Sequence, residues 1–202
     1  MLKDSKSNSR IWACCLLAVT VAGCSDTMIK KSLPAPIRKE KEYQLIGKAK
    51  RMWGGDNFEF GSTNELHYIV IRGIESPKRG QEFFEISRSM IWRRIRDKQL
   101  RIQVYDRDPM MREIADVFLI GETPEQPDLN MGLELLKLGY AWFDGESFEH
   151  SESYRSAEQT ARDAKIGIWK SPNPEAPWDY AAKQHEKRKR ELRQLTNSNQ
   201  QN

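Results

Sequence analysis

The chain is poor in cysteine and histidine, the residues that form disulfides and bind zinc. It has 3 cysteines among 202 residues, at positions 14, 15 and 24, so no disulfide can form within the rest of the chain. Its 3 histidines lie far apart and have no cysteine or histidine partner at ligand spacing, which argues against a zinc site. The sequence also lacks a Ser-His-Asp arrangement, a Walker loop and a dinucleotide fingerprint. A packed hydrophobic core must therefore hold the domain together.

Long apolar runs are also missing. The uncharged run at residues 11–22 is too short for a comfortable membrane span, and it follows Lys3, Lys6 and Arg10, a pattern typical of an export signal. The run ends in Val-Ala-Gly directly before Cys24, which resembles a bacterial lipobox. In that interpretation Cys24 is the first mature residue and carries the lipid. An ordinary signal peptide or an N-terminal anchor is the alternative.

This pattern predicts how the chain is divided. We expect a lipoprotein signal peptide at residues 1–23 and a charged, proline-containing tether at residues 24–42. A domain at residues 43–180 and a basic tail at residues 181–202 complete the chain. The predicted location is the cell envelope, lipid-anchored. Ser25 after the cysteine favours the outer membrane if the cell has two membranes.

A strong charge of one sign is absent as well. The chain has 33 basic and 29 acidic residues, a formal net charge of +4. The leader contributes +2 and the segment from Lys183 onward contributes +4, so residues 24–182 carry −2. Overall charge alone therefore does not draw this domain to a polyanion. Residues 183–193 are charged and compatible with a solvated helix. For this tail, a solubilising role is favoured over an arm that binds nucleic acid or phospholipid.

Alternating apolar residues predict about five strands, at residues 43–51, 58–60, 66–74, 99–105 and 114–120. Helical spacing predicts three helices, at residues 82–98, around residues 129–136 and from a Ser153 cap to residue 165. We expect Gly139 and Gly167 to end the second and third helices, and the prolines of residues 172–177 to stop any further helix. The predicted fold class is mainly β with three helices (α+β), with the strands in a meander that forms a small five-stranded barrel.

Three motifs occur in a recognisable order. Residues 69–80 read I-V-I-R-G-I-E-S-P-K-R-G, residues 112–119 read R-E-I-A-D-V-F-L, and residues 161–180 read A-R-D-A-K-I-G-I-W-K-S-P-N-P-E-A-P-W-D-Y. Together they resemble the staphylococcal nuclease (thermonuclease) family over roughly residues 43–180. The resemblance implies an OB-fold barrel and Ca²⁺-dependent hydrolysis of phosphodiester bonds in DNA or RNA.

The resemblance also implies a site. It places Asp56 and Glu75 at the family's two metal-binding carboxylates, with the backbone carbonyl of Ser76 assisting. Glutamate at position 75 keeps the charge of the family's aspartate but adds a methylene. Calcium tolerates irregular oxygen geometry, so a weakened site is expected. Arg112 falls at the second of two arginines that clamp the phosphate.

Two family positions carry different chemistry here. Val70 stands where the family has its first arginine, and Lys78 stands where a glutamate serves the attacking water. We therefore expect an exported, lipid-anchored, thermonuclease-like protein with impaired activity. The alternative is a catalytically silent barrel that binds nucleic acid or an envelope protein.

Substitutes for the missing groups are conceivable. Arg72 lies on the same strand face as Val70, and Glu82 offers a carboxylate after the loop. The simpler roles are a solvated cation for Arg72 and a helix N-terminal acid for Glu82. The aromatic cluster of Tyr140, Trp142 and Phe143 is more typical of core than of base stacking.

Overall fold

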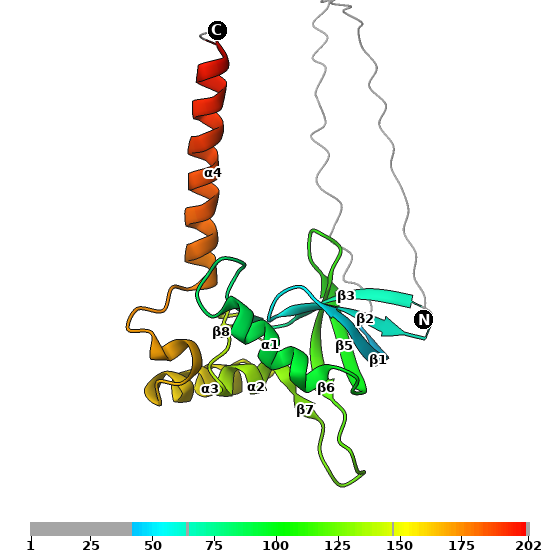
Figure 1. Ribbon diagram of the computed structural model, residues 1–202. Coiled ribbons are helices and arrows are strands. Elements are labelled where there is room, and N and C mark those ends of the chain that lie inside the picture. Colours follow the sequence, from blue (N-terminus) through cyan, green and yellow to red (C-terminus); the bar gives the residue numbers. More distant parts are fainter. Residues whose placement is uncertain (1–41, 64, 147, 201–202) are drawn as a thin grey trace, which may run out of the picture. The chain divides into compact units, whose positions relative to one another are not determined.

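The computed structural model describes residues 42–63, 65–146 and 148–200 (Figure 1). The predicted signal peptide, Cys24 and nearly all of the tether lie outside the described residues. Within the described part of the chain, no helix is both long enough and apolar enough to cross a membrane.

Five strands form a closed barrel (Figure 1). They are β1 (Tyr43–Met52), β2 (Asn57–Ser62), β3 (Glu65–Ile71), β5 (Leu100–Arg107) and β6 (Glu113–Leu119). Their order is β3-β2-β1-β5-β6, and a parallel pairing of β3 with β6 closes the ring. The short β7 (Leu129–Asn130) extends the sheet beyond β6, and β4 (Ile74–Glu75) pairs separately with β8 (Trp142–Phe143). The predicted five-stranded barrel of α+β class is confirmed.

The predicted meander is wrong in one respect. The first three strands do follow one another, but β5 pairs with β1 rather than with β3. The segment between β3 and β5 contains α1 (Phe84–Ile95), which contacts β1. A connection of this length carries the chain across the barrel, so β5 joins the free edge of β1 and β6 then reaches β3.

The core follows the alternation of the strands. Inward positions of the barrel are almost fully buried, among them Phe58, Phe60, Ile69, Ile71, Leu100, Ile102, Ala115 and Val117. Ile91 and Ile95 of α1 pack against them. Ile86, at helical spacing in the sequence, is 49% exposed, because α1 begins at Phe84 and turns Ser87 toward the core instead.

The other helices are α2 (Met131–Lys137), α3 (Ser151–Asp163), the 3-10 helix η1 (Gly167–Lys170) and α4 (Pro177–Gln200). The predicted Ser153 cap is wrong, because α3 begins at Ser151. The prediction that prolines stop any further helix is also wrong, whereas the solvated helix considered for residues 183–193 is present as part of α4. Pro177 is the first residue of α4, a position where the absent N–H costs nothing.

Gly139 follows α2 with a φ of 66° and ends that helix as predicted. After α3, however, Lys165 takes the left-handed conformation at φ 51°, so Gly167 does not end the helix. Gly167 is required for packing, because a Cβ there would lie 2.0 Å from the carbonyl oxygen of Gly139. This close approach seats Trp169 against Trp142, with ring centroids 5.3 Å apart. The aromatic residues Trp142 and Phe143 are buried, as the core interpretation predicted.

Candidate functional site

The turn between β1 and β2 positions Asp56. The backbone N–H of Ile71 donates to the carbonyl oxygen of Asp56 at 2.8 Å, which ties the turn to the end of β3. The N–H of Gly55 donates to Ser76 Oγ at 3.0 Å. A Cβ on Gly55 would lie 2.8 Å from the Cβ of Ser76, so only glycine allows the turn to pack this closely.

The carboxylate of Asp56 is buried, at 3% exposure, and its hydrogen-bonding capacity is well used. Its Oδ2 accepts from the backbone N–H of Ser76 at 3.0 Å, and its Oδ1 accepts from Asn57 Nδ2 at 2.6 Å. A carboxylate buried to this degree needs a nearby positive charge or strong hydrogen bonds.

Lys78 supplies that charge. Its Nζ lies 3.3 Å from Asp56 Oδ2 and 2.8 Å from Glu75 Oε2, so one ammonium bridges both carboxylates. Burial alone lowers the pKa of Lys78, but the charge of Asp56 and the hydrogen bond to Glu75 outweigh burial and raise that pKa above its ordinary value. Lys78 is therefore positively charged at neutral pH.

These residues do not fit a Ca²⁺ ion. Calcium takes six to eight oxygen ligands, and the position between the two carboxylates holds an ammonium instead. In the described part of the chain, no group of three or more His, Cys, Asp or Glu residues is placed to hold a metal. The structure thus brings Asp56, Glu75 and Ser76 together, but around a lysine.

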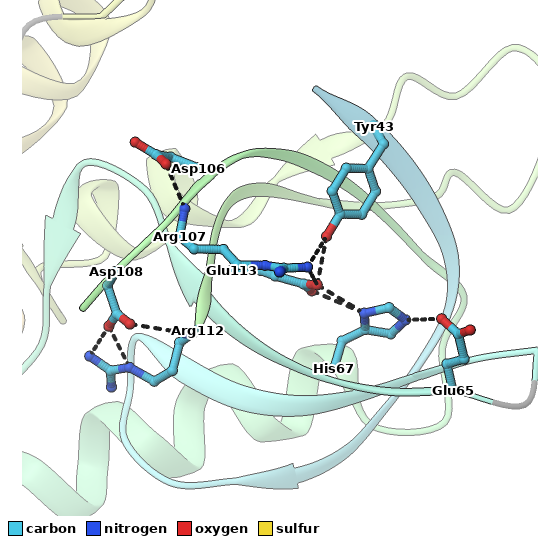
Figure 2. A network of polar contacts seen from close by, with 8 residues as sticks. All are labelled: Tyr43, Glu65, His67, Asp106, Arg107, Asp108, Arg112 and Glu113. Atoms are coloured by element: carbon cyan, nitrogen blue, oxygen red, sulfur yellow. Dashed lines mark hydrogen bonds and ion pairs between the residues drawn. The ribbon is translucent and has the colours of Figure 1, made fainter. Parts of the chain in front are cut away.

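Arg112 precedes β6 and is held by its own loop. Figure 2 shows its guanidinium against Asp108, with Nε 2.6 Å from Asp108 Oδ2. Asp108 Oδ1 also accepts the backbone N–H groups of Met110 and Arg112, each at 2.9 Å. Burial raises the pKa of Asp108, but the hydrogen bonds and charge of Arg112 more than offset it, and the pKa lies below its usual range. The side chain of Arg112 is about one-third exposed.

This loop predicts a pH-dependent loss of stability. A depressed carboxyl pKa stabilises the fold above the unfolded-state pKa, and that stabilisation is lost as pH falls through the folded-state pKa. Asp108→Asn is expected to lower the free energy of unfolding by about 1–2 kcal/mol at pH 7. The difference between variant and unmodified chain should vanish in acid, below the pKa of Asp108. Urea denaturation across this range measures it, with the exposed Asp106→Asn as control. A deficit that persists unchanged in acid contradicts the prediction.

Arg72, a suggested substitute for the missing clamp, is already paired. Its Nη2 lies 2.7 Å from Oδ2 of Asp116, which is 1% exposed, and its Nε donates to Oδ1 at 3.0 Å. The guanidinium also stacks over Tyr105, 3.6 Å from the ring centroid. Contact with a phosphate would require Arg72 to leave this pair. Glu82, the other suggested substitute, is exposed just before α1.

A polar network inside one end of the barrel was not predicted from the sequence (Figure 2). The buried carboxylate of Glu113 accepts from Tyr43 Oη at 2.6 Å and lies 3.1 Å from His67 Nδ1 and 3.5 Å from Arg107 Nη2. A signal was present, because Tyr43, His67 and Glu113 lie in phase with the inward apolar residues of β1, β3 and β6. Polar residues in that phase on three strands indicate a shared interior site.

A basic pocket of about 310 Å³ lies between β1 and α1. It is lined by Lys50, Arg51, Met52, Arg88, Ser89 and Trp92. The guanidinium of Arg51 lies 4.3 Å from the ring centroid of the exposed Trp53, at the end of β1. Cations beside aromatic rings are groups that contact phosphates and bases in single-stranded nucleic acids.

Comparison with known proteins agrees with this architecture. The family model described as "Staphylococcal nuclease homologue" matches residues 68–171, slightly more than half of the chain. The chain is 31% identical over 120 residues to the probable staphylococcal-like nuclease CAN2 of Oryza sativa subsp. japonica, covering 59% of this chain and 30% of the relative. It is 26% identical to the staphylococcal-like nuclease CAN1 of Arabidopsis thaliana, over 77% of this chain and 50% of the relative.

A fungal relative is similar at the same level. The probable endonuclease lcl3 of Pyrenophora tritici-repentis is 28% identical over 58% of this chain and 51% of its own length. The chain thus spans between about a third and a half of the relatives it resembles. Because the family match covers half of the chain and falls on a closed barrel, this protein belongs to the family of staphylococcal nuclease homologues.

Proposed function

We propose that this chain binds nucleic acid through its nuclease-like barrel and hydrolyses phosphodiester bonds poorly or not at all by the Ca²⁺-dependent route. One observation carries this proposal: the Lys78 ammonium bridges the two carboxylates on which that chemistry depends. Hydrolysis needs a metal that polarises the phosphate and a base that serves the water. The positively charged Lys78 side chain supplies neither, so we expect the chain to be a poor catalyst.

The phosphate clamp is incomplete as well. Val70 offers neither a hydrogen-bond donor nor a charge, and Arg112 and Arg72 are each engaged by a carboxylate. Loss of one preorganised donor costs about 10²- to 10³-fold in rate, and loss of an arginine clamp costs about 10³-fold or more. Such losses are not additive, but both act against catalysis.

Binding has separate support. The family acts on nucleic acid, and the pocket between β1 and α1 offers Lys50, Arg51 and Arg88 next to Trp92. Positive groups there attract phosphates although residues 24–182 carry a small negative charge. Affinity that depends on such contacts falls as salt rises.

The full-length chain tests this proposal with single-stranded DNA and RNA. Fluorescence anisotropy should show binding that weakens with salt, and gel assays should show little cleavage with Ca²⁺ or with chelator. Replacing both Arg51 and Lys50 with methionine should weaken binding, whereas Lys98→Met, at an exposed pair that does not line the pocket, should not. Chelator-sensitive cleavage that Arg112→Ala abolishes would establish an active nuclease instead. No binding to either polymer would favour a protein partner.

We also propose that Cys24 carries a lipid and anchors the chain in the cell envelope. The support is the apolar run of residues 11–22 ending at that cysteine. Buried acyl chains contribute about 0.8 kcal/mol per methylene, so two chains hold a protein firmly. A bacterial host expressing the chain should incorporate labelled palmitate into it, and Cys24→Ser should remove both the label and the membrane fraction. Label that persists in Cys24→Ser overturns the assignment.

A further inference from the structure

Lys78 occupies the position between Asp56 and Glu75 that a divalent ion would need. We propose that Lys78 is a built-in cation that takes the place of the divalent ion and closes a latent metal site between Asp56 and Glu75. The folded barrel mouth is then independent of Ca²⁺, and removal of the lysine charge opens the site. The inference shares its residues with the proposed function but does not depend on whether the chain cleaves nucleic acid.

Geometry supports the substitution. The ammonium lies within 3.3 Å of Asp56 and within 2.8 Å of Glu75, so it contacts one oxygen from each carboxylate. These two residues are 19 positions apart in the sequence and come from the β1–β2 turn and from β4. A cation between carboxylates contributed by separate elements relieves their repulsion, which is the structural task of a bound metal.

The lysine is held in place rather than carried on a free loop. The backbone N–H of Lys78 donates to Gln81 Oε1 at 2.9 Å, and the N–H of Gln81 donates back to the carbonyl oxygen of Lys78 at 2.9 Å. The side chain of Gln81 in turn donates to the carbonyl oxygen of Glu175. Pro77 restricts the backbone immediately before Lys78. The loop therefore presents the ammonium to the two carboxylates without an external ligand.

Charge explains why the metal and the lysine exclude each other. Asp56, Glu75 and Lys78 together carry −1, a balance suited to a half-buried cluster. A divalent ion at the same place would stand beside the ammonium and leave the cluster at +1. Without Lys78 the two carboxylates carry −2, which matches the charge of Ca²⁺. The other expected oxygen donor, the carbonyl of Ser76, adjoins Glu75 in the chain.

Thermal unfolding of the full-length chain tests the inference. The melting temperature of the unmodified chain should be the same in Ca²⁺ and in chelator. Lys78→Met keeps the length of the side chain and removes its charge, so it should melt lower in chelator and recover in Ca²⁺. The recovery should rise with the logarithm of the Ca²⁺ concentration and reach about 5–10 °C when Ca²⁺ exceeds its dissociation constant about 100-fold.

Three controls locate the effect. Lys98→Met removes another lysine that pairs with a glutamate, 2.7 Å from Glu122, and should show no response to Ca²⁺. Lys78→Arg keeps the charge and should also show none. Adding Asp56→Asn to Lys78→Met should abolish the response. If Lys78→Met does not fold even in Ca²⁺, terbium luminescence on Lys78→Gln replaces it, with the unmodified chain expected to stay dark.

Two results overturn the inference. One is a Ca²⁺-dependent rise in the melting temperature of the unmodified chain equal to that of Lys78→Met. The other is a folded Lys78→Met or Lys78→Gln chain that binds neither Ca²⁺ nor terbium. Because neither measurement involves nucleic acid, a failure of the unmodified chain to bind DNA or RNA would refute the proposed function and leave this inference standing.

Discussion

Restoring Val70→Arg together with Lys78→Glu is expected to raise the rate of Ca²⁺-dependent cleavage of single-stranded DNA by at least about 10²-fold over the unmodified chain. Position 70 lies on β3, where it pairs with Ile114 of β6, two residues beyond Arg112. An arginine there would face the same side of the sheet as Arg112, so the two could clamp one phosphate. The glutamate at position 78 removes the ammonium between Asp56 and Glu75 and supplies a carboxylate for the attacking water.

Gel assays with Ca²⁺ and with chelator measure this gain. Val70→Arg combined with Lys98→Glu is the matched control, because it has the same change in net charge but leaves Lys78 between the two carboxylates. Arg112→Ala in the restored chain should return cleavage to the background. A restored chain that binds Ca²⁺ yet does not cleave contradicts the prediction. If it binds no Ca²⁺, the extra methylene of Glu75 is implicated, and adding Glu75→Asp tests that explanation.

Arg72→Met is expected to lower the free energy of unfolding by about 3–5 kcal/mol, because it leaves the carboxylate of Asp116 buried and without its counter-charge. Asp116 is fully enclosed, and Arg72 meets it with two hydrogen bonds while lying between Tyr105 and Phe148. The hydrogen bond from Tyr105 Oη to Asp116 Oδ2, at 3.1 Å, remains, but a neutral hydroxyl does not compensate the negative charge of the carboxylate. Breaking one side of a buried ion pair costs far more than the pair contributes net.

Urea denaturation gives the cost, provided that the m-value stays constant. Adding Asp116→Leu to Arg72→Met should recover most of the loss, because no buried charge then remains. Arg88→Met, at an exposed pair with Glu85, should cost less than about 1 kcal/mol. A double variant as unstable as Arg72→Met alone would show that lost packing against the aromatic rings, rather than the orphaned charge, determines the effect.

The fold was predictable because its signals are local. Strand alternation located all five barrel strands to within a few residues, and helical spacing located α1, α2 and α3. The errors occurred at positions where the neighbouring residues along the chain do not determine the local structure. Ile86 has helical spacing but points outward, since the start of α1 sets which residues face the barrel. Pro177 begins a helix because its position in the first turn, rather than its identity, determines its effect.

The candidate site was also predictable only in part. Sequence pattern placed Asp56, Glu75 and Ser76 in one site, and the structure does bring them together. The sequence pattern alone did not show that the Lys78 ammonium occupies the space between the carboxylates, or that Arg72 forms an ion pair with Asp116. The interior network around Glu113 was missed. The sequence shows on each strand separately that a polar residue shares the inward-facing positions, but only closure of the barrel brings these residues into contact.

By itself the amino-acid sequence determined the barrel strands, the segments of α1, α2 and α3, the family framework, and the absence of an arginine at position 70 and of a carboxylate at position 78. Only the tertiary structure decided that Lys78 bridges two carboxylates, that Arg72 is paired and that Tyr43 meets Glu113, which is 70 residues away. The physical reason is that propensity and periodicity act over a few residues. The partner of a charged side chain depends instead on which distant segments barrel closure brings within hydrogen-bonding distance.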